Sequence, residues 1–286
     1  MQAIGVVEKY GRLPIGRFSI KEEALKTVVC IKQVPDSAAK VVAENGRVSW
    51  GDAPLVINPW DEYAVEAALT QQEKLGGTVT AVSVGNESSK DALKHALAMG
   101  CSEAILISDP ALDKADSQAT ARVLAAAIQK MAQNEPVDVA FFGRQAIDGD
   151  MGVTAAQTAR ALGWPALTLI SSIDSLDPAA CKARVQRSIE EGRQIVESKL
   201  PAVISVIKDI GEPRYPSFMG IRKASRANIP TWTVADLGVD APASAVIWPE
   251  VWNPPAREIS CEMITGDSPE EIAEKLADRI MAEKVL

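Results

Sequence analysis

The stretch from Val137 to Trp164 holds the residues with the clearest chemical pattern. It begins with the apolar run Val-Asp-Val-Ala-Phe-Phe, continues through the polar loop Gly-Arg-Gln-Ala-Ile-Asp-Gly-Asp, and ends in small residues that open a predicted helix. In α/β proteins such a strand, loop and helix hold nucleotide phosphates, because a helix N-terminus offers free N–H groups and a positive dipole end. The stretch therefore predicts a nucleotide-binding loop.

Small residues keep the entrance of this predicted helix open. Gly149, Gly152 and Ala155 leave room for a phosphate, and Thr154 adds a hydroxyl donor. The loop matches neither the phosphate-loop pattern with its lysine nor the dinucleotide pattern of three glycines. Binding without hydrolysis is what the loop predicts.

Two aspartates in the loop would repel a phosphate at short range. We expect one of Asp148 and Asp150 to cap the helix, and the other to pair with Arg144 or to bind a ribose hydroxyl. A second interpretation, in which Asp-Gly-Asp is only a turn followed by a cap, has about equal weight. The aspartates alone do not decide between them.

Composition excludes several classes of function. The net charge of -8 argues against a nucleic-acid partner, because phosphate backbones are bound by basic patches. The four cysteines have no paired spacing, so neither a metal site nor a redox pair is predicted. The one histidine, His95, lies in a helical pattern and is best explained as a helix-face residue, so histidine-based catalysis is a poor fit and no catalytic residue is expected.

No apolar run is long enough to span a membrane, and charges interrupt the first 26 residues where a signal peptide would need an apolar core. We expect a cytoplasmic protein without direct membrane insertion.

Apolar runs alternate with helical patterns along most of the chain. Strands are predicted at 27–34, 78–84, 103–108 and 202–207, and helices at 59–75, 88–99 and 117–131, with Asn58 as the cap and Pro59 in the first helical position. This alternation predicts an α/β fold with a doubly wound, mostly parallel, Rossmann-like sheet. The runs 167–173, 184–189 and 194–198 predict added antiparallel strands.

The C-terminal part has a different character. Residues 211–220 are too rich in proline and glycine to predict a helix or strand, yet they carry exposed-looking apolar side chains. Beyond them an extended arm contains Trp232, Trp248 and Trp252, and Ser268 begins a capping box that opens a terminal helix. We expect an N-terminal extension (1–26), a nucleotide-binding domain (27–225) and an arm with a helix that contacts a partner subunit (226–286).

Three further points should lie near the nucleotide loop if the sheet is parallel. They are the end of the first strand around Cys30, the Asn58-Pro59 pair, and the end of the second strand around Val84. Each has an ordinary structural role, as strand core, helix cap and turn respectively. Together they predict an adenosine pocket along the carboxyl edge of the sheet.

Several motifs in order resemble the β subunit of electron transfer flavoprotein, including its FixA-like members. They are Val-Cys-Ile-Lys-Gln-Val-Pro-Asp (29–36), Asn-Pro-Trp-Asp-Glu-Tyr-Ala-Val-Glu-Ala-Ala (58–68), Ala-Leu-Ala-Met-Gly (96–100), Gly-Arg-Gln-Ala-Ile-Asp-Gly-Asp (143–150), Leu-Pro-Ala-Val (200–203), Glu-Pro-Arg-Tyr-Pro-Ser (212–217) and Gly-Ile-Arg-Lys-Ala (220–224). The resemblance extends from about Thr27 to Leu237.

The resemblance implies an electron carrier that pairs with an α subunit holding FAD. It implies electron transfer from acyl-CoA dehydrogenase-type flavoenzymes to a quinone reductase or similar acceptor, in fatty acid oxidation, with an AMP buried in the β subunit. The cofactor-binding residues that it implies are Cys30, Lys32, Asp36, Asn58, Val84, Gly143, Arg144, Gln145, Ala146, Asp148, Gly149, Asp150, Met151, Gly152, Val153, Thr154 and Ala155. The implied partner-binding residues are Tyr215, Pro216, Ser217, Phe218, Met219 and Gly220.

The chain departs from the family pattern at a few positions. Phe218 stands where leucine is common, Ser37 stands where animal members have tyrosine, and Thr154 is followed by alanine where glycine is usual. The first two departures bear on partner choice and on contact with the flavin of the α subunit.

Two alternatives remain open. Val34-Pro35-Asp36 and Asp148-Gly149-Asp150 are like the electron-bifurcating branch, in which a second FAD replaces AMP and NADH reduces it, but the Thr-Ala-Gln-Val-Gly-Pro of that branch is absent after Asp150. AMP is therefore preferred. From a different class, a stand-alone adenine-nucleotide-binding module would use the same pocket without an α subunit, and the long arm argues against it.

Overall fold

A computed structural model describes residues 24–246, 248–256 and 260–284. Most of the expected N-terminal extension (1–26) thus lies outside the described residues. The chain divides into two compact units, one built from residues up to 41 together with 50–249, and the other from 42–49 together with 250 onward. The larger unit carries the candidate site.

A large mixed sheet forms the centre of the first unit. Among the described residues it has nine strands in the order β11-β10-β9-β12-β8-β1-β6-β7-β13. Their bounds are β1 (Leu25–Cys30), β6 (Gly77–Val84), β7 (Glu103–Ile107), β8 (Val139–Gly143), β9 (Ala166–Asp177), β10 (Lys182–Ile189), β11 (Gly192–Lys199), β12 (Ala202–Val206) and β13 (Thr231–Trp232). The strands from β12 to β13 pair in parallel, and β9–β10–β11 pair antiparallel. The predicted fold class is confirmed.

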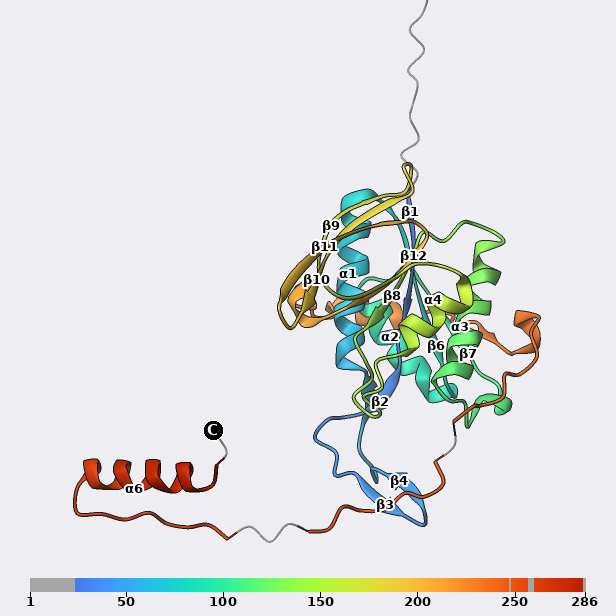
Figure 1. The fold of residues 1–286 in the computed structure, drawn as a ribbon. Coiled ribbons are helices and arrows are strands. Elements are labelled where there is room, and N and C mark those ends of the chain that lie inside the picture. The colour runs from blue at the N-terminus through green and yellow to red at the C-terminus, as the bar shows by residue number, and fades with distance from the viewer. Residues whose placement is uncertain (1–23, 247, 257–259, 285–286) are drawn as a thin grey trace, which may run out of the picture. The chain divides into compact units, whose positions relative to one another are not determined.

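Helices cover both faces of the parallel strands. They are α1 (Pro59–Leu75), α2 (Lys90–Met99), α3 (Ser117–Ala132), α4 (Thr154–Leu162) and α5 (Phe218–Ala224), with short 3₁₀ turns at Glu87–Ser89, Pro110–Leu112, Lys208–Ile210 and Ala235–Leu237. Successive strand residues point to opposite faces, so Val29 packs with α1 and α2 while Val28 packs with α3 and α4. Figure 1 shows α1 on one side of β1 and the α3–α4 pair on the other.

Two local predictions need correction. The segment 211–220 is not irregular throughout, because its last three residues begin α5. Ser217 makes this possible, since its side chain accepts a hydrogen bond from the Gly220 N–H at 2.9 Å and so caps the helix. The first strand also differs, because it ends at Cys30 and a separate short strand, β2 (Gln33–Pro35), pairs with β5 (Leu55–Ile57).

The second unit consists of a hairpin and of the chain from Glu250 onward. The expected arm (226–286) is thus divided between the two units, and its Thr231–Trp232 forms strand β13 of the large sheet. The hairpin joins β3 (Val42–Glu44) to β4 (Arg47–Ser49) through Asn45 and Gly46, both with positive φ, as the sequence predicts. The Asn253 side chain bonds both backbone groups of Ala43, accepting at 2.6 Å and donating at 3.0 Å. The arm ends in α6 (Pro269–Ala282), capped by Ser268.

Within the described residues, no helix combines the length and the apolar character that crossing a membrane requires.

Candidate nucleotide site

Asn58 connects helix α1 to the loop that follows β8. Asn58 is the N-cap residue of α1 and Pro59 follows in the first helical position, as predicted, but the Asn58 side chain makes no capping hydrogen bond. Instead its amide donates to the carbonyl of Gln145 at 2.8 Å and its oxygen accepts from the Ile147 N–H at 3.2 Å. The residue is buried, and it fastens the loop in two places.

Asp61 lies one turn further along α1 and binds two strand ends. Its buried carboxylate accepts the backbone N–H of Lys32, just after β1, at 2.8 Å and that of Gly143, the last residue of β8, at 3.2 Å. A Cβ atom on Gly143 would lie 2.4 Å from the carboxylate, so only glycine allows this approach. Asp61 was not among the predicted site residues, although its position three residues after Asn58, on the same face of one helix, was a signal.

The protein environment changes the acidity of two groups under the loop. Burial raises the pKa of Asp61 to about 7, against the opposing effects of its hydrogen bonds from Lys32, Asn58 and Gly143 and of the Lys32 charge. Burial also raises the pKa of the neighbouring Cys30 thiol, and the Asp61 charge adds to this. Cys30 is thus a neutral, packed thiol at the end of β1.

The charged residues of the loop pair differently from our expectation. Asp148 accepts two hydrogen bonds from the Lys32 ammonium, at 2.6 and 2.8 Å, and Asp150 accepts one from the Gln145 amide at 2.7 Å. Neither aspartate pairs with Arg144 or caps α4 in the hydrogen bonds of the described chain, and Arg144 instead lies 5.7 Å from the Trp60 ring. Lys32 partly neutralises the negative charge near the helix entrance.

The entrance of α4 suits an anionic group. Its N-cap is Val153, no side chain of the described residues caps it, and its first turn has no acidic residue. Gly152 reaches it with φ near 62°, and the Gln157 side-chain oxygen is buried without a partner among the described residues. Free N–H groups, small side chains and an unsatisfied polar atom fit the phosphate and polar edges of a nucleotide.

The structure brings most of the predicted cofactor-binding residues to one edge. Strands β6, β1 and β8 are neighbours and parallel, so Val84, Cys30 and Gly143 end together there. Lys32 and Asn58 bond to the loop directly, and Arg144 to Ala155 form the loop and the start of α4. Asp36 follows β2 instead, and its carboxylate accepts the Ala38 N–H.

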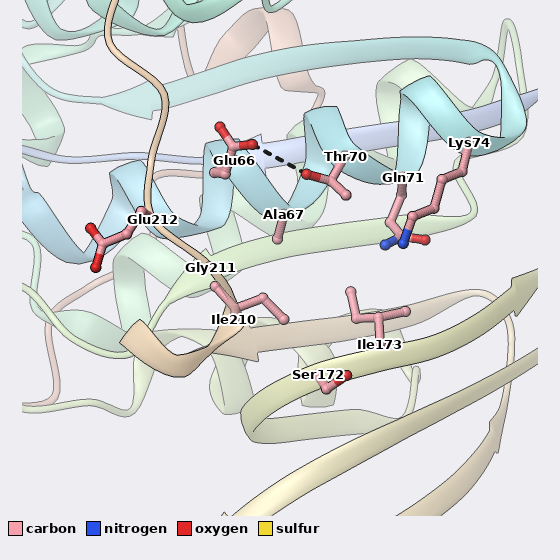
Figure 2. Close-up of a pocket in the computed structure, with 10 residues that line it drawn as sticks. All are labelled: Glu66, Ala67, Thr70, Gln71, Lys74, Ser172, Ile173, Ile210, Gly211 and Glu212. Atoms are coloured by element: carbon pink, nitrogen blue, oxygen red, sulfur yellow. Dashed lines mark hydrogen bonds between the residues drawn. The ribbon is translucent and has the colours of Figure 1, made fainter.

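A small pocket of about 170 Å³ lies elsewhere, between α1 and β9. Figure 2 shows Ala67 and Gln71 of α1 facing Ile173 of β9 and Ile210. Its lining includes none of the predicted cofactor-binding residues. The pocket is therefore distinct from the nucleotide loop.

The predicted partner-binding residues form an exposed apolar surface. Tyr215, Phe218 and Met219 are 94%, 79% and 68% exposed, and Ile221 of α5 is also exposed. Large apolar side chains with such exposure in one segment are typical of a contact surface for another molecule.

Comparison with known proteins places the chain in one family. The family model for the electron transfer flavoprotein domain matches residues 51–237. FixA of Azotobacter vinelandii is 34% identical over 87% of this chain and 92% of its own length. The electron transfer flavoprotein β subunit of Clostridium acetobutylicum is 38% identical over 76% of this chain and 81% of its own length. Subunit CarD of the caffeyl-CoA reductase–Etf complex of Acetobacterium woodii is 34% identical over 92% of this chain and 100% of its own length.

These matches join the parallel sheet, the loop after β8 and the motif order into one assignment: the chain belongs to the electron transfer flavoprotein family, as a subunit of the β and FixA type that serves electron transfer.

Proposed function

We propose that this chain is the β subunit of a heterodimer whose α subunit carries FAD, and that it buries one AMP. The heterodimer takes electrons from acyl-CoA dehydrogenase-type flavoenzymes and passes them to a quinone reductase or similar acceptor. FAD supplies the redox chemistry when it is bound, and AMP has no redox part.

The observation that carries the AMP proposal is the fastened loop at the entrance of α4. Asn58 holds the loop backbone, Asp61 holds the end of β8, and Lys32 pairs with Asp148 of the loop. The free N–H groups at the entrance of α4 would hold the phosphate, and Cys30 and Val84 would line the adenosine side at the strand ends. A site set up in this way holds a nucleotide without any residue placed to cleave it.

The nucleotide content of the heterodimer tests the proposal. The chain is purified together with its α subunit, denatured, and the released nucleotides are separated and counted. One FAD and one AMP per heterodimer support the proposal. A stable monomer that binds ATP and forms no complex with an α subunit would contradict it and favour the stand-alone module.

A bifurcating role is the second candidate. It is supported by the Val34-Pro35-Asp36 and Asp148-Gly149-Asp150 motifs, which resemble that branch. In this case the site in this chain would hold a second FAD, which would accept electrons from NADH. Two FAD and no AMP per heterodimer, with NADH bleaching the flavin absorbance, would replace the first proposal by this one.

We assign two segments of the chain, each of which carries exposed apolar side chains, to partners. The arm and helix of residues 226–286 contact the α subunit, and Tyr215–Gly220 contacts the donor flavoenzyme. Phe218 would be the anchor because it is an aromatic residue whose side chain is 79% exposed. Phe218→Ala should leave both nucleotides bound and slow electron transfer from the donor, whereas loss of folding would mean that Phe218 is a core residue.

A further inference from the structure

Arg214 ties the segment before the exposed apolar surface to helix α1. Its backbone N–H and its Nε both donate to one carboxylate oxygen of Glu66, at 3.0 and 2.7 Å, and one of its terminal nitrogens donates to the other oxygen at 2.9 Å. The second terminal nitrogen donates to Glu73 at 2.6 Å. These bidentate hydrogen bonds to Glu66 fix both the position and the orientation of the guanidinium.

Glu66 is the more enclosed of the two carboxylates. Its side chain is 14% exposed against 60% for Glu73, and it also accepts the Thr70 hydroxyl, as Figure 2 shows. Burial acts to raise the pKa of Glu66, but the hydrogen bonds and charge of Arg214 more than offset this, so its pKa lies below the ordinary value. The Arg214–Glu66 pair is therefore charged and partly sheltered from solvent.

A second contact holds the other end of the surface. Gly220 packs so closely on α2 that an added Cβ would lie 2.3 Å from the Ala98 carbonyl oxygen. Between this contact and Arg214, the side chains of Tyr215, Phe218 and Met219 are mostly exposed. Burial therefore does not fix these three side chains. The Ser217 cap and the Gly220 contact hold the start of α5, and Arg214 holds the segment that leads into it.

We propose that Arg214 is a positioning residue for docking: by binding Glu66 and Glu73 it holds the Tyr215–Gly220 surface in the form that the donor flavoenzyme recognises. This inference rests on the docking role proposed above. Binding is stronger when a loop is ordered beforehand, because less conformational entropy is lost in the complex. Arg214 itself need not touch the partner.

The first measurement concerns the heterodimer alone. Hydrogen exchange of residues 211–220 is followed by mass spectrometry in the wild type, in Arg214→Gln and in Arg214→Lys. We expect about tenfold faster exchange in Arg214→Gln. Arg214→Lys should exchange at an intermediate rate, because lysine keeps the positive charge but cannot make the bidentate hydrogen bonds of the guanidinium. As a matched control, Arg184→Gln on β10 breaks an exposed ion pair with Glu197 of β11 and should leave this exchange unchanged. Unchanged exchange in Arg214→Gln would overturn the inference.

The second measurement concerns docking. Electron transfer into the heterodimer is followed with butyryl-CoA dehydrogenase, reduced by butyryl-CoA, as the donor. Arg214→Gln should raise the KM for the dehydrogenase about tenfold and leave kcat within twofold, with both nucleotides still bound. Because Arg214 acts through the apolar surface, adding Arg214→Gln to Phe218→Ala should raise KM no further, whereas simple destabilisation would make the two effects multiply.

The two proposals fail in different ways. If Phe218→Ala raises KM and Arg214→Gln does not, the docking surface stands and the positioning role of Arg214 is wrong. If neither substitution changes KM, the docking role of this surface is wrong and the inference falls with it.

Discussion

Helix α1 fastens two segments, and it does so by different physical means. At its N-terminus, and from buried positions, Asn58 binds backbone groups of the loop after β8, and Asp61 binds the backbone N–H of Gly143 at the end of β8. Two and four turns further on, Glu66 and Glu73 bind the Arg214 guanidinium in a setting that is partly open to solvent.

This difference in burial determines how each segment responds to its surroundings. A buried polar side chain that loses its partner leaves an unsatisfied group, which costs about 1–3 kcal/mol, and a buried carboxylate responds to pH. An exposed ion pair contributes little and weakens with salt. We therefore expect the nucleotide loop to respond to pH and to substitutions that change side-chain size beneath it. We expect the segment 211–217, which Arg214 holds, to respond to ionic strength.

The largest expected effect is the pH dependence of Asp61. Its pKa is about 7 in the folded chain against an ordinary value of 3.8, so between these pH values the folded state holds a proton that the unfolded state has lost. Stability should therefore fall as pH rises from about 4 to 7. At about 1.36 kcal/mol per pKa unit, this amounts to at most about 4 kcal/mol.

The measurement is the free energy of unfolding in urea from pH 4 to 8, for the wild type and for Asp61→Asn. The pKa of Glu66 is lowered, so this residue changes stability in the opposite direction, but it does so in both proteins and cancels in their difference. Asparagine also loses one acceptor, and this offset is the same at every pH. Parallel curves for the two proteins would show that Asp61 does not titrate in this range.

The next effect comes from Gly143. In Gly143→Ala the new Cβ would meet the Asp61 carboxylate at 2.4 Å and the Trp60 backbone at 2.6 Å, so the end of β8 must move away from α1. We expect a loss of about 3 kcal/mol in unfolding free energy, together with loss of the nucleotide. Gly149→Ala is the matched control, because its Cβ would have nothing within 4 Å. Equal stability of the two variants would mean that the approach of Asp61 to β8 is not tight.

A smaller effect is expected for Asn58→Ala. The substitution leaves the Gln145 carbonyl and the Ile147 N–H without their partner, which should cost about 2 kcal/mol. Cys30 gives a local measurement, because its thiol is buried and its pKa is raised, so it reacts with thiol reagents only when the loop opens. Faster labelling of Cys30 in Asn58→Ala is the expected result, while Cys181, which is exposed, should react at the same rate in both proteins.

The sequence predicts the fold well because its signals are local. Alternating apolar runs and helical patterns give the parallel sheet and the hairpins of β9 to β11, and Asn45-Gly46 gives the turn between β3 and β4. It also predicts that the loop after β8, Cys30 and Val84 meet at one edge. These predictions depend on periodicity and on the ends of parallel strands, which are visible in a single chain.

The partners of individual polar groups are not visible in the same way. Asp148 pairs with Lys32, which is 116 positions away, and Arg214 pairs with Glu66 across 148 positions. Asn58 is the N-cap residue of α1, as the sequence predicts, but in the folded chain its side chain binds the loop after β8 and makes no capping hydrogen bond. Such contacts depend on how the elements pack, so propensity and spacing could not supply them.

The smallest expected effect separates the two carboxylates that hold Arg214. Glu73 is more exposed than Glu66 and binds a single nitrogen of the guanidinium, so Glu73→Gln should loosen residues 211–217 only slightly. In 0.5 M salt the difference from wild type should vanish, because the wild-type ion pair is then screened as well. Glu66→Gln should loosen the segment more, and at high salt as well, because the glutamine side chain has one oxygen and cannot accept both hydrogen bonds from the guanidinium. Hydrogen exchange of residues 211–217 at low and high salt measures both. If the two variants respond alike to salt, the contact of Arg214 with α1 is a single exposed ion pair, and the contrast between its sheltered and open halves disappears.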